Sequence, residues 1–176
     1  MSKYIIDVES DGPVPPLYSL VSIGVVVLNK DGTIKDTFYG QMRPLEGADW
    51  IPDALAVSGH TRDEHLSFPP AVETMHKFKK FIDDTNEGGR PILMSDNNQF
   101  DGGYINYYFH RFLGENPFGW TSSNLKDIFK GMEMNLFNSG KKFSRMRKTK
   151  HTHHPVDDAT GNAEALLEMK KRGLNC

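Results

Sequence analysis

The sequence contains one cysteine and no long apolar run. Cys176 is the single cysteine of the 176 residues, so an internal disulfide is excluded and a reducing compartment is expected. No apolar run approaches the roughly 20 residues that a membrane-spanning helix needs. The acids Asp7 and Glu9 interrupt the N-terminus before the apolar core of a signal peptide could form. These absences argue against a disulfide-stapled, secreted or membrane protein, and we expect a cytoplasmic one.

Internal repeats and long linkers are also absent from the sequence. The short stretches VPPL, FPP and EGGR are predicted to be loops within one unit. Hydrophobic residues make up 38% and charged residues 25% of the chain, which is the balance of an ordinary globular protein rather than a disordered or fibrous one. We therefore expect residues 1–176 to form one domain with a sizeable core.

Charge is unevenly distributed along the chain, although the net charge is only −2. Residues 1–140 contain 12 Lys and Arg against 19 Asp and Glu, whereas residues 141–176 contain 9 against 4. Six of those nine basic residues lie within residues 141–150, KKFSRMRKTK. An acidic body beside a basic strip indicates a polyanion held near a carboxylate site. A solvated, mobile loop is the alternative interpretation.

The hydrophobic pattern predicts three antiparallel strands followed mainly by helices. The strands are expected at Tyr4–Val8, Leu20–Leu28 and Thr33–Met42, and a fourth short strand at Pro91–Ser95. Helices are expected over residues 70–83 (with Val72, Met75, Phe78, Lys79 and Ile82 at helical spacing, a core-facing stripe with lysines outside), 101–113, 124–137 and 157–172 (with Ala159, Ala163, Leu166 and Lys170 on one side). This order predicts an α/β domain with a central mixed sheet flanked by helices, and leaves a fifth strand without a position.

Three separate segments each end an apolar element with acids. Asp7 and Glu9 leave the same face of the first strand's end, Asp101 opens a helix after the polar loop SDNNQ, and Asp158 follows His153 by five residues. Acids that meet at one point repel unless a cation neutralises them. Each acid alone also has a simpler interpretation, as a solvated strand end or as an acid favoured by a helix dipole.

The ordered set resembles the DEDD superfamily of 3′–5′ exonucleases, in its histidine-bearing (DEDDh) branch, which includes the polymerase III proofreading subunit, ribonuclease T and oligoribonuclease. The motif D-x-E-[ST] matches Asp7–Ser10, N-x-x-F-D matches Asn97–Asp101, and H-x-x-x-x-D matches His153–Asp158. Each motif alone is weak, but their order and spacing along nearly the whole chain resemble this branch closely.

The resemblance implies a ribonuclease H-like fold and hydrolysis of DNA or RNA from the 3′ end, with release of 5′-mononucleotides. It implies catalysis by two Mg²⁺ or Mn²⁺ ions, which prefer oxygen ligands. Asp7 is expected to bridge both ions, with Glu9 and Asp158 completing the first and Asp101 holding the second. His153 is expected to be the general base, because a neutral imidazole suits this task near pH 7.

The histidines around this motif allow another interpretation. His-x-His-His could contribute to a zinc cage, but a structural zinc site needs four ligands and the lone cysteine is terminal. His151 and His154 are therefore expected to be loop or substrate-facing residues. Asp158 is preferred as the metal ligand and Asp157 as the N-cap of the last helix, with the opposite assignment left open.

Substrate contacts are predicted at the flanks of the motifs and in the basic strip. The residues are Ser10, Gly12, Leu17, Asn97, Phe100, Arg145, Arg147 and Lys148. We expect nucleic acid with a single-stranded 3′ end as the partner, and no membrane; DNA and RNA are not separated, and a homodimer stays open. Two alternatives are a non-catalytic nucleic-acid-binding module, which would lack an acid or the base, and a ribonuclease H-like endonuclease, which would lack the histidine.

Overall fold

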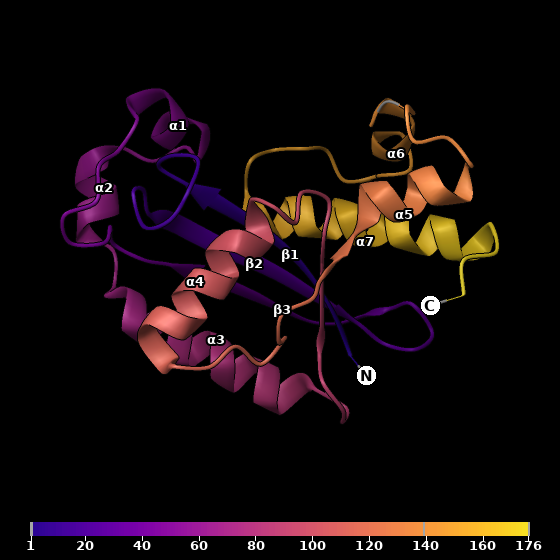
Figure 1. The fold of residues 1–176 in the computed structure, drawn as a ribbon, viewed down its shortest axis with the longest axis horizontal. Helices are drawn as coiled ribbons and strands as arrows, with labels where there is room; N and C mark the ends of the chain where they lie inside the picture. The colour runs from indigo at the N-terminus through magenta and orange to yellow at the C-terminus, as the bar shows by residue number, and fades with distance from the viewer. Residues whose placement is uncertain (1, 139, 176) are drawn as a thin grey trace.

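A five-stranded mixed sheet forms the centre of the computed structural model, which describes residues 2–138 and 140–175 (Figure 1). Cys176 therefore lies outside the described residues. The strands stand in the order β3-β2-β1-β4-β5: β1 (Lys3–Ser10), β2 (Leu20–Leu28), β3 (Ile34–Gln41), β4 (Ile92–Ser95) and β5 (Ser123–Asn124). The first three strands pair antiparallel, whereas β4 and β5 continue parallel to β1. The mixed sheet is thus confirmed, and the strand without a predicted position is the two-residue β5.

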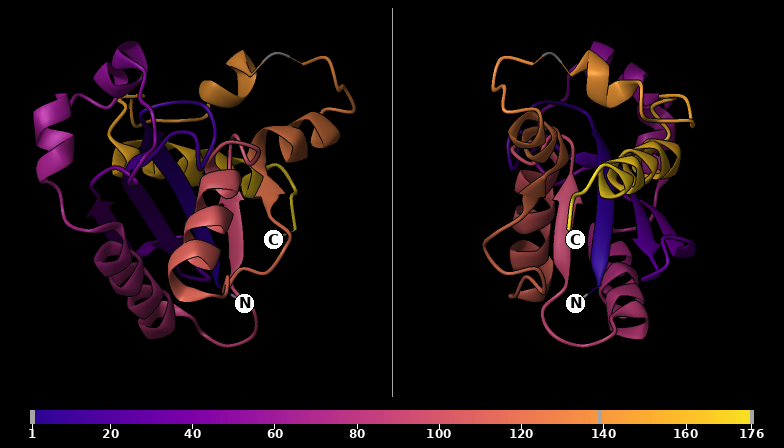
Figure 2. Two further views of the ribbon diagram at one scale, coloured as in Figure 1. Left: turned by 60° about the vertical axis from the view of Figure 1, so that its left-hand side comes forward. Right: turned by 90° about the vertical axis from the view of Figure 1, so that its right-hand side faces the viewer.

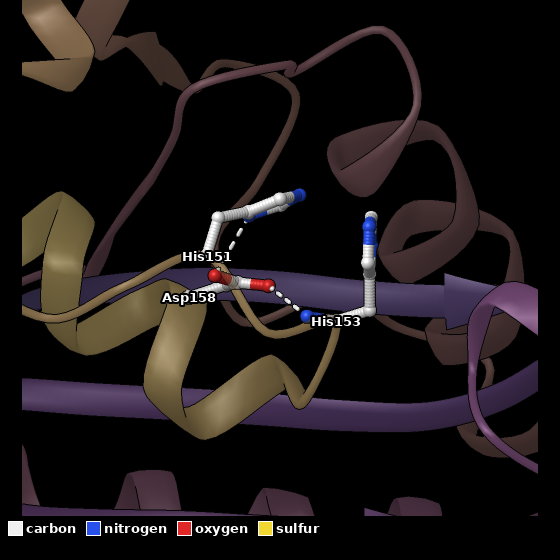
Figure 3. A group of neighbouring side chains, drawn as sticks. All are labelled: His151, His153 and Asp158. Atoms are coloured by element: carbon white, nitrogen blue, oxygen red, sulfur yellow. Dashed lines mark hydrogen bonds and ion pairs between the residues drawn. The ribbon is translucent and has the colours of Figure 1, made fainter.

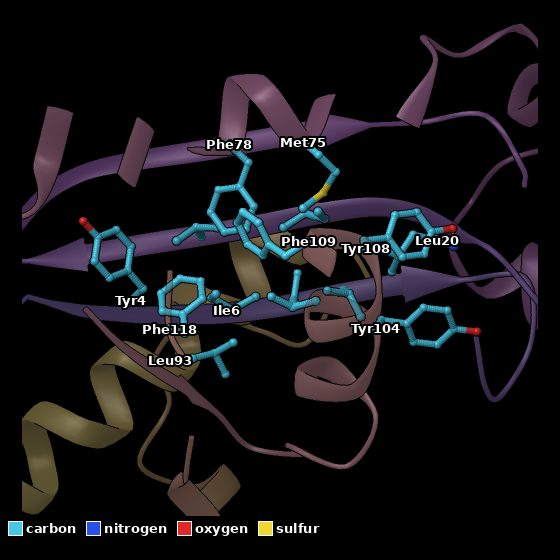
Figure 4. Packing of buried hydrophobic residues seen from close by; sticks show 14 of the residues in the cluster. Tyr4, Ile6, Leu20, Met75, Phe78, Leu93, Tyr104, Tyr108, Phe109 and Phe118 are labelled. Atoms are coloured by element: carbon cyan, nitrogen blue, oxygen red, sulfur yellow. Dashed lines mark hydrogen bonds between the residues drawn. The ribbon is translucent and has the colours of Figure 1, made fainter. Parts of the chain in front are cut away.

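Helices pack on both faces of the sheet. On one face, α3 (Ala71–Thr85) and α4 (Asp101–Leu113) form an aromatic core with alternate residues of β1. Figure 4 shows Phe78, Phe109 and Phe118 meeting in this core, with ring centroids 5.3–6.2 Å apart. On the other face lie α5 (Leu125–Met132), α6 (Lys141–Ser144) and α7 (Pro155–Lys171). Residues of β1 with odd numbers, from Ile5 on, point toward this second face.

Two short helices lie between β3 and α3, in a region for which the hydrophobic pattern predicted no helix. They are α1 (Pro52–Val57) and α2 (Arg62–Ser67), which begins with a capping box formed by Thr61 and Glu64. Figure 2 shows α1 and α6 at the same end of the molecule, away from the N-terminus. This is the end at which β1 finishes. The start of α1 is tied to the chain just after that strand, because the backbone N–H of Ile51 donates to the carbonyl oxygen of Asp11 at 2.8 Å.

Two predicted helices differ from the observed ones in length or core face. In α3 the side chain of Val72 is 38% exposed, and Ala71 and Thr74 are buried in its place, because the helix begins directly after Pro70. The helix predicted over residues 124–137 ends at Met132 as α5. Leu136 and Phe137 lie beyond it and are 76% and 97% exposed, so they are not part of the core.

The last helix, α7, begins two residues before its predicted start. Its N-cap is His154 and Pro155 is its first residue, a position that proline favours. Asp157 is therefore not the N-cap, which corrects the prediction; its carboxylate instead accepts a hydrogen bond from the Thr152 hydroxyl at 3.0 Å. Lys170 is exposed rather than part of the buried stripe.

The start of α7 rests directly on β2. A Cβ atom at Gly24 would collide with the backbone of Pro155 and Val156, so glycine is required for this close approach. Among the described residues, no helix combines the length and the apolar content needed to cross a membrane.

Candidate active site

The predicted carboxylates meet at the end of β1. Asp7 and Glu9 come from that strand, Asp101 from the first residue of α4, and Asp158 from the first turn of α7. One ligand oxygen from each of Asp7, Glu9 and Asp158 lies within 4.8 Å of the others. Asp101 is tied to the same strand, because its Oδ1 accepts the backbone N–H of Val8 at 3.2 Å. Three segments that are distant in sequence therefore converge on one point.

These carboxylates are difficult to ionise together. Burial raises the pKa of Asp7 well above its usual range, and the charges of Asp101, Glu9 and Asp158 raise it further. Burial, followed by the charges of Asp158 and Asp101, raises the pKa of Glu9 to about 8. Burial, followed by the charge of Asp96, raises the pKa of Asp101 to about 7. Bound cations would reverse these shifts by stabilising the charged forms.

The donor set fits a hard divalent metal. All four groups offer carboxylate oxygens, the ligands that Mg²⁺ and Mn²⁺ prefer. The Oδ2 atom of Asp101 is buried and has no hydrogen-bond partner among the described residues. A buried acceptor without a partner is costly, and a cation in the cluster would satisfy it. The residues present therefore fit a divalent metal centre.

Asp158 differs from Asp101 because its oxygens already have partners. Its Oδ1 accepts a hydrogen bond from Nη2 of Arg147 at 2.6 Å and lies 2.8 Å from Nδ1 of His151. Its Oδ2 accepts the backbone N–H of His153 at 2.9 Å. Arg147 was predicted to contact substrate, but its side chain is only 9% exposed and is held against Asp158. His151, predicted to be a loop or substrate-facing residue, also contacts this carboxylate.

His153 stands at the edge of the carboxylate cluster. Its Nδ1 lies 3.8 Å from Oε1 of Glu9, and its side chain is 46% exposed. Its backbone adopts a left-handed conformation with φ of 60°, which is uncommon for a residue with a side chain and is found preferentially at functional sites. His154 instead stacks on Tyr39, with ring centroids 4.8 Å apart. The two neighbouring histidines therefore occupy different environments.

The predicted substrate residues fall into two groups. Ser10 is the last residue of β1, and Leu17 lies in the loop that follows: the hydroxyl of Ser10 donates to the carbonyl of Gly12 at 2.6 Å, and Leu17 is 64% exposed. Asn97 is exposed and Phe100 is half-buried against α4, close to Asp101 in sequence. The contact of these residues with substrate stays a prediction.

The basic strip contributes one side of a groove beside the carboxylates. The groove has a volume of about 400 Å³ and is lined by Asp96, Lys126, Ser144, Arg147, Lys148, Thr149, Lys150 and His151. Lys148 is thus placed in the groove. The exposed Arg145 does not line it, so the structure separates these two predicted contacts. Lys126, which forms an ion pair with Asp96 at 2.8 Å, was not predicted.

A second buried cluster, which the sequence interpretation missed, fixes the loop after β1. Asp11 is completely buried, and its carboxylate accepts the backbone N–H of Ser19 and pairs with Nη1 of Arg62 at 3.0 Å. His65 lies beside it, fully buried, and burial lowers the pKa of His65 to about 4. The available signal was the position of Asp11 directly after the first motif; Arg62 and His65 carry no local sign of this partnership.

Comparisons with known proteins are consistent with this arrangement. The fold is shared with a solved nuclease domain of the DEDDh family. Residues 2–169 match the family model of the Rv2179c-like domain, a 3′–5′ exoribonuclease domain, and the chain belongs to this family. The enzyme class is therefore that of a 3′–5′ exonuclease.

Individual relatives agree with the family. The 3′–5′ DNA exonuclease Cap18 of Escherichia coli is 34% identical over 129 residues, which are 72% of this chain and 67% of Cap18. The fold is similar to that of the nuclease domain of 3′hExo, a DEDDh family member solved with rAMP, with a TM-score of 0.79 and 19% identity over 98% of this chain and 92% of that one. Exonuclease I of E. coli, solved with a dT13 oligonucleotide, has a TM-score of 0.75 and 14% identity over 97% of this chain and 41% of its own.

Proposed function

We propose that residues 1–176 act as one exonuclease domain that removes 5′-mononucleotides from the 3′ ends of single-stranded nucleic acid, in the cytoplasm. The observation that carries this proposal is the convergence of four carboxylates, three of them with raised pKa values, beside a basic groove. Such a cluster is suited to binding cations, and a groove lined by lysines is suited to binding phosphates.

The carboxylates would hold two divalent ions, Mg²⁺ or Mn²⁺. Asp7 would bridge them, Glu9 and Asp158 would complete the first site, and Asp101 would hold the second. The Oδ2 atom of Asp101 is buried and has no hydrogen-bond partner in the described part of the chain, which supports its assignment. When bound, two such ions would activate a water and stabilise the leaving oxygen of a phosphodiester.

His153 would take the proton from the attacking water. Its ring is exposed at the open side of the cluster and lies next to Glu9, so a water at the carboxylates would be within its reach. The backbone N–H of His153 donates to Asp158, which fixes the position of the proposed base relative to a proposed ligand.

The substrate would enter as a single strand. Lys126, Lys148 and Lys150 line the groove beside the carboxylates and would contact successive phosphates, while Leu17 would lie against the terminal nucleotide. The family model is named for an exoribonuclease, and Cap18 is a DNA exonuclease. RNA and DNA are therefore both candidate substrates, and both should be compared.

The decisive experiment uses oligonucleotides of DNA and RNA labelled at the 5′ or the 3′ end, with Mg²⁺, with Mn²⁺ and with excess chelator. We expect stepwise shortening from the 3′ end, release of 5′-mononucleotides, faster cleavage of single strands than of blunt duplexes, and no reaction with chelator. Undiminished cleavage in excess chelator, or cleavage of closed circles, would contradict the proposal. Asp7→Asn serves as the inactive control and His154→Ala as the matched active one.

A further inference from the structure

His151, His153 and Asp158 form a second group of metal-ligating side chains that shares one residue with the carboxylate cluster. Each offers one ligand atom, and the three atoms lie within 4.8 Å of one another. Figure 3 shows both imidazole rings on the same side of the Asp158 carboxylate. The rings of the two histidines meet edge to face, with centroids 4.2 Å apart.

The chemistry of this group differs from that of the carboxylates. Two imidazole nitrogens and one carboxylate oxygen, with a position left open, are a ligand set that zinc uses in proteins. Imidazole is a softer ligand than carboxylate and is less suited to Mg²⁺. The group therefore favours a different metal from the one that Asp7, Glu9 and Asp101 favour.

The geometry requires only a small adjustment around an ion. Ligand atoms on a tetrahedral zinc ion are roughly 3.3 Å apart, given bonds of about 2.0–2.1 Å. The side chains of His151 and His153 are 55% and 46% exposed, which leaves room for their rings to adjust, whereas the side chain of Asp158 is buried. Arg147 donates to Oδ1 of the same carboxylate, so a zinc ion would share Asp158 with this guanidinium, and the two imidazoles would supply the ligands that Mg²⁺ does not favour.

This site is not the histidine cage considered from the sequence alone. His154 stacks on Tyr39 and contributes nothing to it, and the third ligand is the acid Asp158. A three-ligand site that is open to solvent does not stabilise a fold in the way a closed four-ligand site does. Binding of a metal at this site would instead affect the activity of the enzyme.

We infer that His151, His153 and Asp158 bind Zn²⁺, and that zinc bound there inhibits the exonuclease. Zinc at this site occupies the proposed base and one proposed ligand of the first Mg²⁺ or Mn²⁺ ion. The inhibition rests on the proposed function, whereas the binding of zinc does not. His151 is the residue that distinguishes this site, because it belongs to the zinc group and not to the carboxylate cluster.

The first measurement is zinc binding without nucleic acid. Isothermal titration with ZnCl₂, and the visible absorption of Co²⁺ used as a zinc substitute, are compared for the wild type, His151→Ala, His151→Gln and His154→Ala. We expect one zinc per chain in the wild type, binding weakened by roughly tenfold or more in both His151 variants, and no change in His154→Ala. Equal binding in the His151 variants, or no zinc binding by the wild type, would overturn the inference.

The second measurement is the zinc concentration that halves Mg²⁺-supported cleavage, determined for each variant relative to its own uninhibited rate. We expect this concentration to rise by roughly tenfold or more in both His151 variants and to stay constant in His154→Ala. Zinc that binds through His151 without slowing cleavage would refute the inhibitory role. Absence of any cleavage with Mg²⁺ or Mn²⁺ would instead refute the proposed function, and the titration would still decide the zinc site.

Discussion

The two sides of the carboxylate cluster differ in how their charge is balanced. On the side of α4, Asp101 is held by a backbone N–H of β1, and its second oxygen has no partner among the described residues. On the side of α7, Asp158 is contacted by Arg147, by His151 and by backbone N–H groups. Asp158 is therefore paired with a positively charged side chain, the guanidinium of Arg147, whereas Asp101, within the described part of the chain, is not. An ion entering the first side meets little competition, whereas an ion entering the second must compete with a guanidinium.

The largest effect is expected from the side that lacks a cation. Asp101→Asn should lower turnover with Mg²⁺ by about 10³-fold or more, because it removes a ligand charge that contributes several kcal/mol. The metal-free variant should nevertheless resist urea better than the wild type, because a buried repelling charge is removed. Steady-state kinetics and urea unfolding without metal check the two expectations. Lower stability together with full activity would contradict the assignment of Asp101.

A smaller but specific loss is expected for the proposed base. His153→Ala should lower turnover by about a hundredfold while metal and substrate binding stay largely intact. His154→Ala is the matched control, since this ring stacks on Tyr39 and should change turnover little. Turnover, metal titration and melting temperature are measured for both. A closed structural zinc cage predicts a different result, with similar losses of stability in the two variants.

The guanidinium at Asp158 gives a test of the other side. Arg147→Met should tighten Mg²⁺ binding several-fold, because a competing positive charge is removed. It should also cost about 1–3 kcal/mol of unfolding free energy without metal, because Asp158 loses a buried partner. Mg²⁺ titration and urea unfolding measure these effects, with the exposed Arg145→Met as the control. Unchanged Mg²⁺ affinity with a raised KM would return Arg147 to the substrate-binding role predicted from the sequence.

The raised pKa values predict how the stability of the metal-free protein depends on pH. The pKa of Glu9 rises from 4.5 to about 8 and that of Asp101 from 3.8 to about 7, so the folded state keeps protons that the unfolded state has released. Their contribution to stability is full below about pH 4 and is lost as the pH rises through about 7 to 8. Urea midpoints across this range should therefore fall with pH, and saturating Mg²⁺ should flatten the decline. A metal-free profile that Asp101→Asn leaves unchanged would count against these shifts.

The smallest effect is expected at the rim of the groove. Lys148→Ala should weaken substrate binding a few-fold and reduce the dependence of binding on salt by about one phosphate contact. Lys142→Ala is the control, since Lys142 pairs with Glu133 and does not line the groove. Fluorescence anisotropy with a labelled single strand in Ca²⁺, across a series of salt concentrations, would measure both. If the two variants showed the same dependence of binding on salt, Lys148 would not contact a phosphate of the substrate strand.

Much of this arrangement could be predicted because it depends on local patterns. The apolar runs of β1 and β2 and the periodicity of α4 are strong signals, and each acid motif stands at the end of such an element. The two-residue β5 was beyond prediction because it is defined by its parallel pairing with β4 rather than by any period of its own. The predicted start of α7 lies two residues too late, because aspartate is a common cap residue and favours Asp157, whereas the helix begins at Pro155, whose fixed φ suits a first helical residue.

The partners of the site were harder to predict than its members. The charge of Arg147 predicts contact with a polyanion. In the folded chain the same charge instead forms an ion pair with Asp158. Asp11, Arg62 and His65 are brought together by α2 folding back over the loop after β1. Sequence motifs indicate which groups perform chemistry, but the partner of a charged residue depends on which side chains the fold brings next to it.

Gly24 has a consequence that reaches beyond packing. Because the backbone at the start of α7 touches β2 where no side chain intervenes, the level of that helix above the sheet is set by atoms common to every amino acid. The distance of Asp158 from the strand that carries Asp7 and Glu9 is therefore set by a direct contact between two backbones. A single methyl group at position 24 would push the start of α7 away from the sheet. Asp158 would then move away from the other acids of the cluster, although every acid would still be present in the sequence.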